Sequence, residues 1–360
     1  MRTKKLGMVM MGIILSMLLA ACGSSSSSEP TDSNSTGAET ETKQSDSLTI
    51  YTAFPEQEVL AYVSEFEKET GIKVNFVRLS AGQILARIQA EGNNPQASVW
   101  YGGPSDTLIA AANSGLLEPF EPSNSDILPE EFSDSEWNWT PIYVGALGFA
   151  SNSDWLEREG IDPPTSWADL LKPEFADNVS VAHPASSGTS YTVLATLVQL
   201  MGEEDAIDYL KQLDGNIRQY TQSGSAPANN AGLGEVGVGI AFAHDILAPM
   251  KEGYPITLSF PEDGTGYEVG AVGIIKGGPA DEVENAKKFI EWSVSKEAQD
   301  LYDKGGHYRL PINPEAIVPE GATPLTELDV IEYDAVWAGE SREELINKFE
   351  NEIRNQSAAQ

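Results

Sequence analysis

The chain has 360 residues, enough for about two domains of roughly 100–200 residues each. Its 55 Asp and Glu against 22 Lys and Arg leave a net charge of −33, which excludes a nucleic-acid binder, because such a protein needs a basic face. A single cysteine excludes a disulfide framework and any cysteine-cluster metal site, and three histidines without a short ligand spacing argue against a His-based metal centre.

The first residues have the pattern of an export signal. A basic start precedes the apolar run Leu6–Leu18, which is too short to span a membrane as a mature helix. The next four residues, Leu19-Ala20-Ala21-Cys22, resemble the lipobox of bacterial lipoproteins. The resemblance implies a signal peptide at 1–21, cleavage before Cys22, a diacylglyceryl thioether on the Cys22 sulfur, and an acyl chain such as palmitate on the new N-terminus. A simple secretory signal with an incidental cysteine is the alternative.

The segment that follows, residues 22–47, is rich in Ser, Thr and acidic residues and has no apolar periodicity. This composition predicts a disordered tether between the lipid anchor and a folded body.

The first half of the folded body alternates strands and helices. Apolar periodicity and glycine punctuation predict these elements. The expected strands are Leu48–Tyr51, Ile72–Phe76 and Ser98–Tyr101, and the expected helices are Glu56–Glu69, Gly82–Glu91 and Ser105–Ser114. Short links between alternating strands and helices are typical of an α/β layer with a largely parallel sheet.

The second half repeats this alternation. The expected strands are Val179–Ala182, Val238–Ala243 and Tyr267–Lys276, and the expected helices are Thr189–Met201, Asp205–Leu213, Val283–Val294 and Glu340–Arg354. The glycine-rich stretch Gly232–Gly239 lacks the order of a phosphate loop or a dinucleotide fingerprint and is interpreted as a helix end entering a strand. Neither GxSxG, HExxH nor CxxC occurs, so the sequence offers no motif for catalysis, and we expect no enzyme activity and no cofactor.

Three stretches of the folded body carry a family resemblance. Pro95–Gly103, Ser114–Pro119 and Ser293–Gln299 resemble the extracellular solute-binding proteins of ABC importers, in the branch that takes ferric iron, phosphonates and sugar phosphates. The resemblance covers about residues 48–355. It implies a two-lobed α/β fold of the type II periplasmic-binding-protein kind, with two mixed sheets and a hinge of two crossing segments, which we place near Ile142–Ala150 and Tyr267–Ile275 because both are apolar and contain glycine.

The resemblance also implies the domain boundaries of the chain and its binding partners. The expected parts are lobe 1 at 48–142, lobe 2 at 143–268, and a return to lobe 1 with C-terminal helices at 269–360. The expected partners are a small anionic ligand, an ABC permease with its ATPase, and a membrane reached through the lipid anchor. We expect an extracytoplasmic monomer that binds no nucleic acid.

The residues that bind the sugar hydroxyls of the ligand are predicted from one motif and one later residue. The sequence Ala241–Ile246 resembles the hexose-phosphate-binding members, in which a His-Asp pair and a later Glu hold sugar hydroxyls; here these are His244, Asp245 and Glu268. Carboxylates accept hydrogen bonds from vicinal hydroxyls, and an imidazole adds a donor or an acceptor. Structural roles compete with this reading, because an Asp there can cap a helix and a lone His can be a packed core residue.

Carboxylates repel a phosphate, so the anion is expected elsewhere. The hydroxyl-rich run between a strand and a helix start offers N–H and O–H donors at a helix N-terminus; its residues are Ser186, Ser187, Gly188, Thr189 and Ser190. A plain helix cap is the alternative. Other candidate contacts follow predicted strands, where open α/β sheets bind ligands: Thr52, Ala53, Ser80, Gly82, Gly102, Gly103, Gln222, Ser223, Gly224 and Ser225. Since no Arg lies inside these motifs, recognition by amides and hydroxyls is favoured over an ion-pair clamp.

Other ligands stay open on the same scaffold. In the ferric branch two adjacent tyrosines bind Fe³⁺, and this chain has no two adjacent tyrosines. We therefore expect no metal, although His244, Asp245 and Glu268 could form a different metal site. A phosphonate, thiamine or a polyamine, or a sensing or adhesion module without transport, are the remaining alternatives.

Overall fold

The computed structural model describes residues 44–355. The predicted signal peptide, the lipidation site Cys22 and the tether up to residue 43 lie outside the described residues. Residues at the end of the predicted tether are part of the folded body: the Ser45 N–H donates to Asp281 O (2.8 Å), and the first strand begins at Ser47. None of the helices in the described range is long and apolar enough to cross a membrane.

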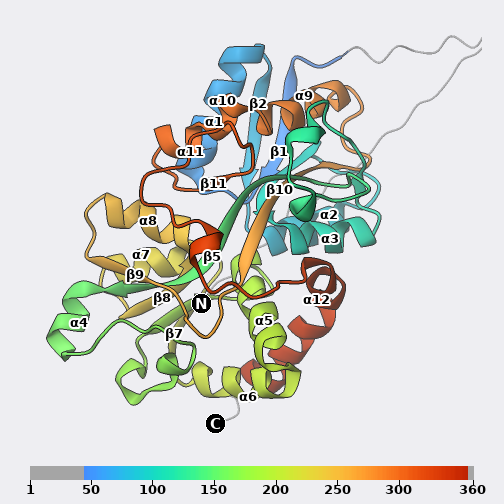
Figure 1. The fold of residues 1–360 in the computed structure, drawn as a ribbon. Coiled ribbons are helices and arrows are strands. Elements are labelled where there is room, and N and C mark those ends of the chain that lie inside the picture. The colour runs from blue at the N-terminus through green and yellow to red at the C-terminus, as the bar shows by residue number, and fades with distance from the viewer. Residues whose placement is uncertain (1–43, 356–360) are drawn as a thin grey trace, which may run out of the picture. The chain divides into compact units, whose positions relative to one another are not determined.

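Strands from both halves of the chain form two mixed sheets joined through one long strand (Figure 1). The strands are β1 (Ser47–Thr52), β2 (Lys73–Arg78), β3 (Val99–Pro104), β4 (Leu117–Glu118), β5 (Thr140–Asn152), β6 (Val179–Ala182), β7 (Ile217–Thr221), β8 (Val238–Phe242), β9 (Ile256–Ser259), β10 (Tyr267–Ile275) and β11 (Leu310–Pro311). The central order is β2-β1-β3-β10-β5-β8-β6-β7.

Helices cover these sheets. They are α1 (Glu56–Thr70), α2 (Ala81–Glu91), α3 (Ser105–Asn113), α4 (Ser153–Glu159), α5 (Gly188–Met201), α6 (Glu203–Asp214), α7 (Ala226–Gly232), α8 (Ala243–Lys251), α9 (Val283–Ser293), α10 (Lys296–Gln299), α11 (Leu301–Lys304) and α12 (Ala335–Phe349). The predicted elements are present with shifted ends, and the sequence analysis did not single out β4, β7, β9, β11, α4, α8, α10 or α11. Gly232 ends α7 and Val238 begins β8, as the interpretation of the glycine-rich stretch expected.

The crossing between the lobes is β5. Its first half pairs with β10, where Gly145 faces Glu268, and its second half pairs with β8, where Leu147 faces Phe242. The chain returns just before β10, where the Leu147 N–H donates to Gly266 O (2.9 Å). The first crossing segment expected from the sequence is therefore observed in β5, whereas the return crossing lies just before the expected range Tyr267–Ile275, which is β10.

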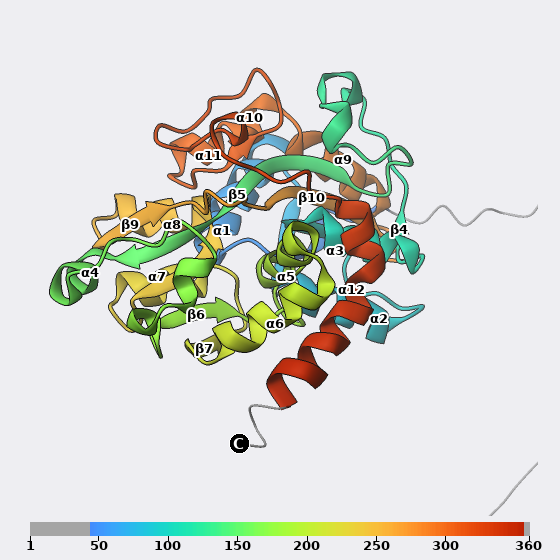
Figure 2. The same ribbon diagram turned by 60° about the horizontal axis from the view of Figure 1, so that its bottom comes forward.

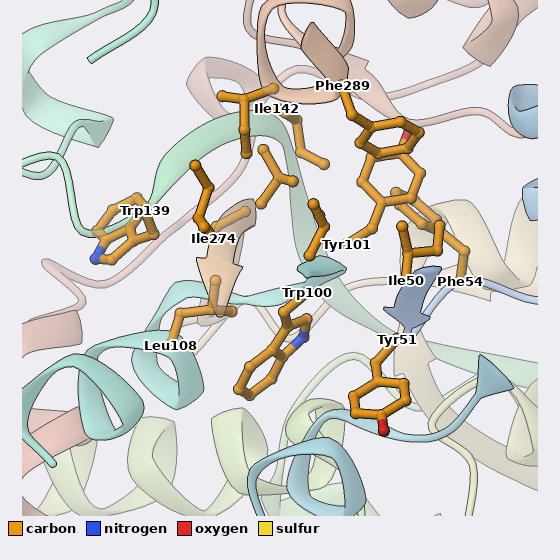
Figure 3. Close-up of a cluster of buried hydrophobic side chains, with 14 of the residues drawn as sticks. Ile50, Tyr51, Phe54, Trp100, Tyr101, Leu108, Trp139, Ile142, Ile274 and Phe289 are labelled. Carbon is orange, nitrogen blue, oxygen red and sulfur yellow. The ribbon is translucent and has the colours of Figure 1, made fainter. Parts of the chain in front are cut away.

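Each lobe has its own hydrophobic core. The first contains aromatic side chains of β1, β3 and α9, among them Tyr101 and Phe289, whose ring centroids lie 4.9 Å apart (Figure 3). The second is built around α5, α6 and β8. Full burial of such large side chains contributes about 1.5–3 kcal/mol each.

The last helix contacts both lobes. Figure 2 shows α12 running from beside α3 to beside α6. Leu345 and Phe349 of α12 belong to the second core, whereas Gly339 packs against Ile109 of α3. The lobe boundaries predicted at 142 and 268 stay an interpretation, and α12 links the two cores rather than belonging to one.

Candidate functional site

A polar cavity lies between the lobes, where strands of both sheets end. Open α/β sheets bind ligands at such carboxyl ends of strands. The lining residues are Ala53, Phe54, Pro55, Arg78, Ser80, Ala81, Gly103, Pro104, Tyr143, Ser187, Gly188, Thr189, Gly224, Ser225, Phe242, His244, Asp245, Glu268 and Arg309.

The N-terminus of α5 faces this cavity. Ser187 is the N-cap, and its hydroxyl accepts from the Ser190 N–H (3.4 Å). The first N–H groups of a helix lack an intrahelical acceptor, so Gly188 and Thr189 present amides there. Of the five residues predicted for phosphate, Ser187, Gly188 and Thr189 line the cavity and Ser186 and Ser190 do not. Ser187 thus combines the capping role with a place in the cavity wall.

The β7–α7 loop lies against this helix start. Gly224 and Ser225 line the cavity, and a Cβ on Gly224 would lie 2.0 Å from Thr189 Oγ1. Only glycine allows this close approach. The two preceding residues do not line the cavity: Gln222 O accepts from Ser80 Oγ (2.9 Å) and Ser223 Oγ accepts from Arg78 Nη2 (2.8 Å). These two hydrogen bonds join the lobes at the edge of the cavity.

On the first-lobe side, three of six predicted residues line the cavity: Ala53, Ser80 and Gly103. The other three support the loops behind it. Thr52 Oγ1 accepts from the Phe54 N–H (3.3 Å). A Cβ on Gly82 would lie 2.3 Å from Ala185 O, and one on Gly102 would lie 2.6 Å from the Phe54 ring.

Arg78, at the end of β2, is a cavity residue that the sequence analysis missed. Its Nε donates to Phe54 O (3.3 Å) and its Nη2 to Ser223 Oγ (2.8 Å). A guanidinium is always charged and presents five donors. The cavity wall therefore includes an arginine, although the sequence analysis favoured amides and hydroxyls there. The available signal was the position of Arg78 at the end of an alternating strand.

The opposite end of the cavity holds the three residues predicted for sugar hydroxyls: His244, Asp245 and Glu268. His244 Nε2 lies 3.4 Å from Glu268 Oε1 and 3.9 Å from Asp245 Oδ2. Asp245 is in the first turn of α8 and does not cap it, because the N-cap position is Phe242.

Arg309, like Arg78 a charged cavity residue that the sequence analysis missed, is at the centre of this end. Its Nε and Nη2 bind both oxygens of Glu58 (2.9 and 3.3 Å), and its Nη1 lies 2.7 Å from His244 Nε2. The guanidinium carbon lies 4.7 Å from the centre of the Phe54 ring and 4.5 Å from that of Tyr143. Since an arginine only donates, His244 Nε2 accepts, and the imidazole is neutral with its proton on Nδ1.

Burial sets the protonation of this end. It raises the pKa of Glu268 well above its usual range, and the nearby Arg309 only partly offsets the effect. It raises the pKa of Asp245 to about 6, again against the attraction of Arg309. Burial and then Arg309 lower the pKa of His244 well below its usual value. Removal of a carboxylate or an imidazolium from water disfavours the charged form in each case.

Two glycines of the crossing strands make room for these side chains. A Cβ on Gly145 would lie 2.5 Å from His244 Nδ1, and a Cβ on Gly270 would lie 2.1 Å from the Tyr143 ring. The His244 ring fits in this space, stacked on Phe242 at 5.6 Å between centroids.

The geometry argues against the alternative metal site. Within residues 44–355, no three His, Cys, Asp or Glu side chains are grouped so that they could hold a metal ion. His244 Nε2, the atom that would coordinate a metal beside the carboxylates, already accepts from Arg309, and a guanidinium so placed repels a cation.

Two lobes joined by crossing strands around a polar cavity define the class of proteins that close over a small ligand. Within that class, the chain belongs to the bacterial extracellular solute-binding proteins, whose family model matches residues 105–334.

Three relatives illustrate the likeness. The solved structure of the periplasmic binding protein AfuA from Actinobacillus pleuropneumoniae, with exogenous fructose-6-phosphate bound, matches with a TM-score of 0.83 at 40% identity, over 86% of this chain and 99% of that chain. An uncharacterized protein of Haemophilus influenzae is 39% identical over 80% of this chain and 85% of its own. The Fe(3+)-binding periplasmic protein of Serratia marcescens is 25% identical over 80% and 85%.

Proposed function

We propose that this protein captures a phosphorylated sugar or a similar organophosphate between its lobes and delivers it to an ABC permease with its ATPase. The observation that carries the proposal is that one cavity has hydrogen-bond donors at one end and carboxyl groups at the other. The α5 N-terminus and Arg78 line it together with His244, Asp245 and Glu268. A helix N-terminus and an arginine suit a phosphate, and carboxyl groups suit hydroxyls. The sugar phosphate in the 40% identical AfuA structure supports the same ligand class.

The division of labour within the cavity follows from charge. Ser187, Thr189 and the amides of the α5 start would hold the phosphate, with Arg78 as a charged donor beside them. Hydrogen bonds to a charged group contribute about 1.5–3 kcal/mol each. Asp245 and Glu268 would hold hydroxyls, and His244 would orient Glu268. The remaining predicted contacts, such as Ser80 and Gly103, complete the wall.

Calorimetry with a sugar phosphate, the free sugar and Fe³⁺ tests this function. We expect binding of the phosphate ester that survives EDTA and is lost with the free sugar. Ferric iron is the second candidate, because a Serratia marcescens relative is named for it; binding that disappears with EDTA would favour it and contradict our proposal. A phosphonate shares the phosphate chemistry and would compete for the same end.

We also infer that the protein works outside the cytoplasm as a monomer, tied to the membrane through Cys22, and captures its ligand without turnover. The lipobox resemblance supports the anchor. Cys22→Ser is expected to release the protein from the membrane fraction, or to leave it unprocessed, with unchanged ligand affinity. Unchanged fractionation and processing would contradict the anchor.

A further inference from the structure

A second buried polar cluster connects the two lobes outside the ligand cavity. It lies where α3 of the first lobe, α5 of the second lobe and α12 contact one another (Figure 2). Its members are Asp106 and Thr107 of α3, Thr192 of α5, Tyr333 just before α12, and Arg342 of α12. None of these five side chains lines the ligand cavity, so the proposed contacts with phosphate and hydroxyl groups do not use them.

Asp106 accepts hydrogen bonds from hydroxyls of both lobes. Its Oδ1 accepts from Thr107 Oγ1 (2.8 Å) of the same helix, and its Oδ2 accepts from the Tyr333 hydroxyl (2.9 Å). Oδ2 also lies 3.1 Å from Thr192 Oγ1, which belongs to the second lobe. Asp106 is 1% exposed, and hydrogen bonds to a carboxylate are about twice as strong as neutral ones. Each donor therefore stabilises a charge that water does not reach.

Thr192 connects this carboxylate to the start of α5. It lies one turn after Gly188, the first residue of the helix, and its Oγ1 is also 3.2 Å from Gly188 O. One hydroxyl proton therefore has two acceptors within reach. Because a carboxylate is the stronger acceptor, we expect the proton to point to Asp106. The first lobe thus holds the first turn of α5, whose residues Gly188 and Thr189 line the cavity.

Arg342 holds the chain just before the same helix start. Its Nη2 donates to Pro184 O (3.4 Å), in the loop between β6 and α5, and its guanidinium carbon lies 4.3 Å from the centre of the Tyr191 ring. Its Nη1 donates to Thr107 Oγ1 (3.3 Å), and that hydroxyl donates to Asp106. The charges of Arg342 and Asp106 attract each other. Removal of either one leaves the other as a buried charge without compensation.

The backbone at the start of α5 also touches the first lobe directly. A Cβ on Gly188 would lie 2.6 Å from Pro104 Cδ and 3.0 Å from Ala81 Cβ, and a Cβ on Gly82 would lie 2.3 Å from Ala185 O. Only glycine allows the two lobes to approach this closely at both positions. The lobes are therefore in direct contact at the point where the helix start meets the cavity.

We propose that Asp106 and Arg342 are positioning residues for ligand capture, which fix the N-terminus of α5 against the first lobe so that the phosphate donors of both lobes meet in one place. This inference rests on the proposed function. The donors concerned are those at the start of α5 and Arg78 of the first lobe. Because the cluster joins the two lobes, it is complete only when they are closed. A contact that exists only in the closed complex slows ligand release and leaves the encounter with the open protein unchanged.

Thr192 offers a direct test because two conservative variants separate its hydroxyl from its shape. Thr192→Val keeps the shape and removes the donor to Asp106, whereas Thr192→Ser keeps the donor. Rapid mixing with fructose 6-phosphate, followed by tryptophan fluorescence, gives the rates of association and release, and calorimetry gives the affinity. We expect Thr192→Val to release the ester at least about tenfold faster with an unchanged association rate, as for one lost charged hydrogen bond. Thr192→Ser is expected to behave like the wild type.

A second variant and a control separate positioning from a general loss of stability. Asp106→Asn keeps the size of the side chain but leaves Arg342 without its counter-charge, so we expect release to be accelerated at least as much. Thr70→Val removes a threonine hydroxyl that donates to Phe66 O (2.7 Å) within α1, far from the other lobe in sequence contact, and is expected to keep both rates. A purely structural role would lower the free energy of unfolding in urea and leave the rates of the folded protein unchanged.

Failure of this inference is distinct from failure of the proposed function. If the wild type binds the ester and Thr192→Val keeps its release rate, the positioning role is overturned and the proposed function stands. The positioning role is also overturned if Thr192→Val changes only the association rate, or if Thr192→Ser releases the ester as fast as Thr192→Val does. If neither fructose 6-phosphate nor glucose 6-phosphate binds the wild type, the proposed function fails and this inference fails with it.

Discussion

Arg309 is expected to stabilise the fold in addition to lining the cavity. Arg309→Met removes two hydrogen bonds to Glu58 and the contact with His244, while the methionine still fills the space between the Phe54 and Tyr143 rings. Glu58, itself 7% exposed, is then a buried charge without a cation beside it and keeps only the hydrogen bond from the Tyr62 hydroxyl (3.2 Å). Breaking a buried ion pair in this way costs about 3–5 kcal/mol.

A double-mutant cycle isolates the pair. Urea unfolding gives the free energy for the wild type, Arg309→Met, Glu58→Gln and the double variant. We expect the double variant to be more stable than the sum of the single effects predicts, by about 1–3 kcal/mol, because a neutral pair leaves no isolated charge. Lys68→Ala, which breaks a solvent-exposed pair with Glu65, is the control without a measurable change. Single effects that add within about 0.5 kcal/mol would refute the reasoning.

Three other changes probe the site. Asp245→Asn is expected to flatten the pH dependence of stability. Burial raises the pKa of this carboxyl to about 6, so the wild type loses stability as the pH rises from about 4 to about 6. If urea titrations of the variant across that range keep the wild-type slope, the result counts against this role. Gly145→Ala places a Cβ 2.5 Å from His244 Nδ1, so we expect loss of ligand affinity by calorimetry with an unchanged circular dichroism spectrum; full affinity would show that the ring can move. Tyr333→Phe deletes a donor to the buried Asp106 (2.9 Å) and is expected to lower thermal stability by about 1–2 kcal/mol, whereas an unchanged melting temperature would mean that water replaces the phenol.

The sequence predicted the fold well because the local patterns agree with it. Alternating strands, helices ended by glycine and hydroxyl-rich loops at strand ends are local signals, and the loops they mark do converge on the cavity. Which residue of such a loop lines the cavity depends on where the helix begins and on contacts with loops distant in sequence. Ser187 caps α5 and lines the cavity, whereas the Ser186 hydroxyl donates to Gln222 O (3.3 Å), so composition alone could not tell the two serines apart.

The two arginines of the cavity were not predicted from local sequence patterns. Arg78 is the last residue of β2, close to other predicted contacts, and was overlooked because it lies outside any glycine or hydroxyl motif. Arg309 lies in an irregular segment, and its partner Glu58 is 251 residues away. The residues next to Arg309 in the sequence therefore predict neither its burial nor its pairing with Glu58.

The net charge of the chain does not predict the charge inside the cavity. An excess of exposed acids argues against a polyanion as partner, because such a partner would meet the surface. In the proposed function a small anion enclosed between the lobes would meet Arg78 and the α5 N-terminus instead, and exposed charges beyond about 8–10 Å are screened by salt. Buried charges are screened far less, so we expect the few charged groups that line the cavity, such as Arg309 with its partner Glu58, to matter more for the ligand than the total of −33.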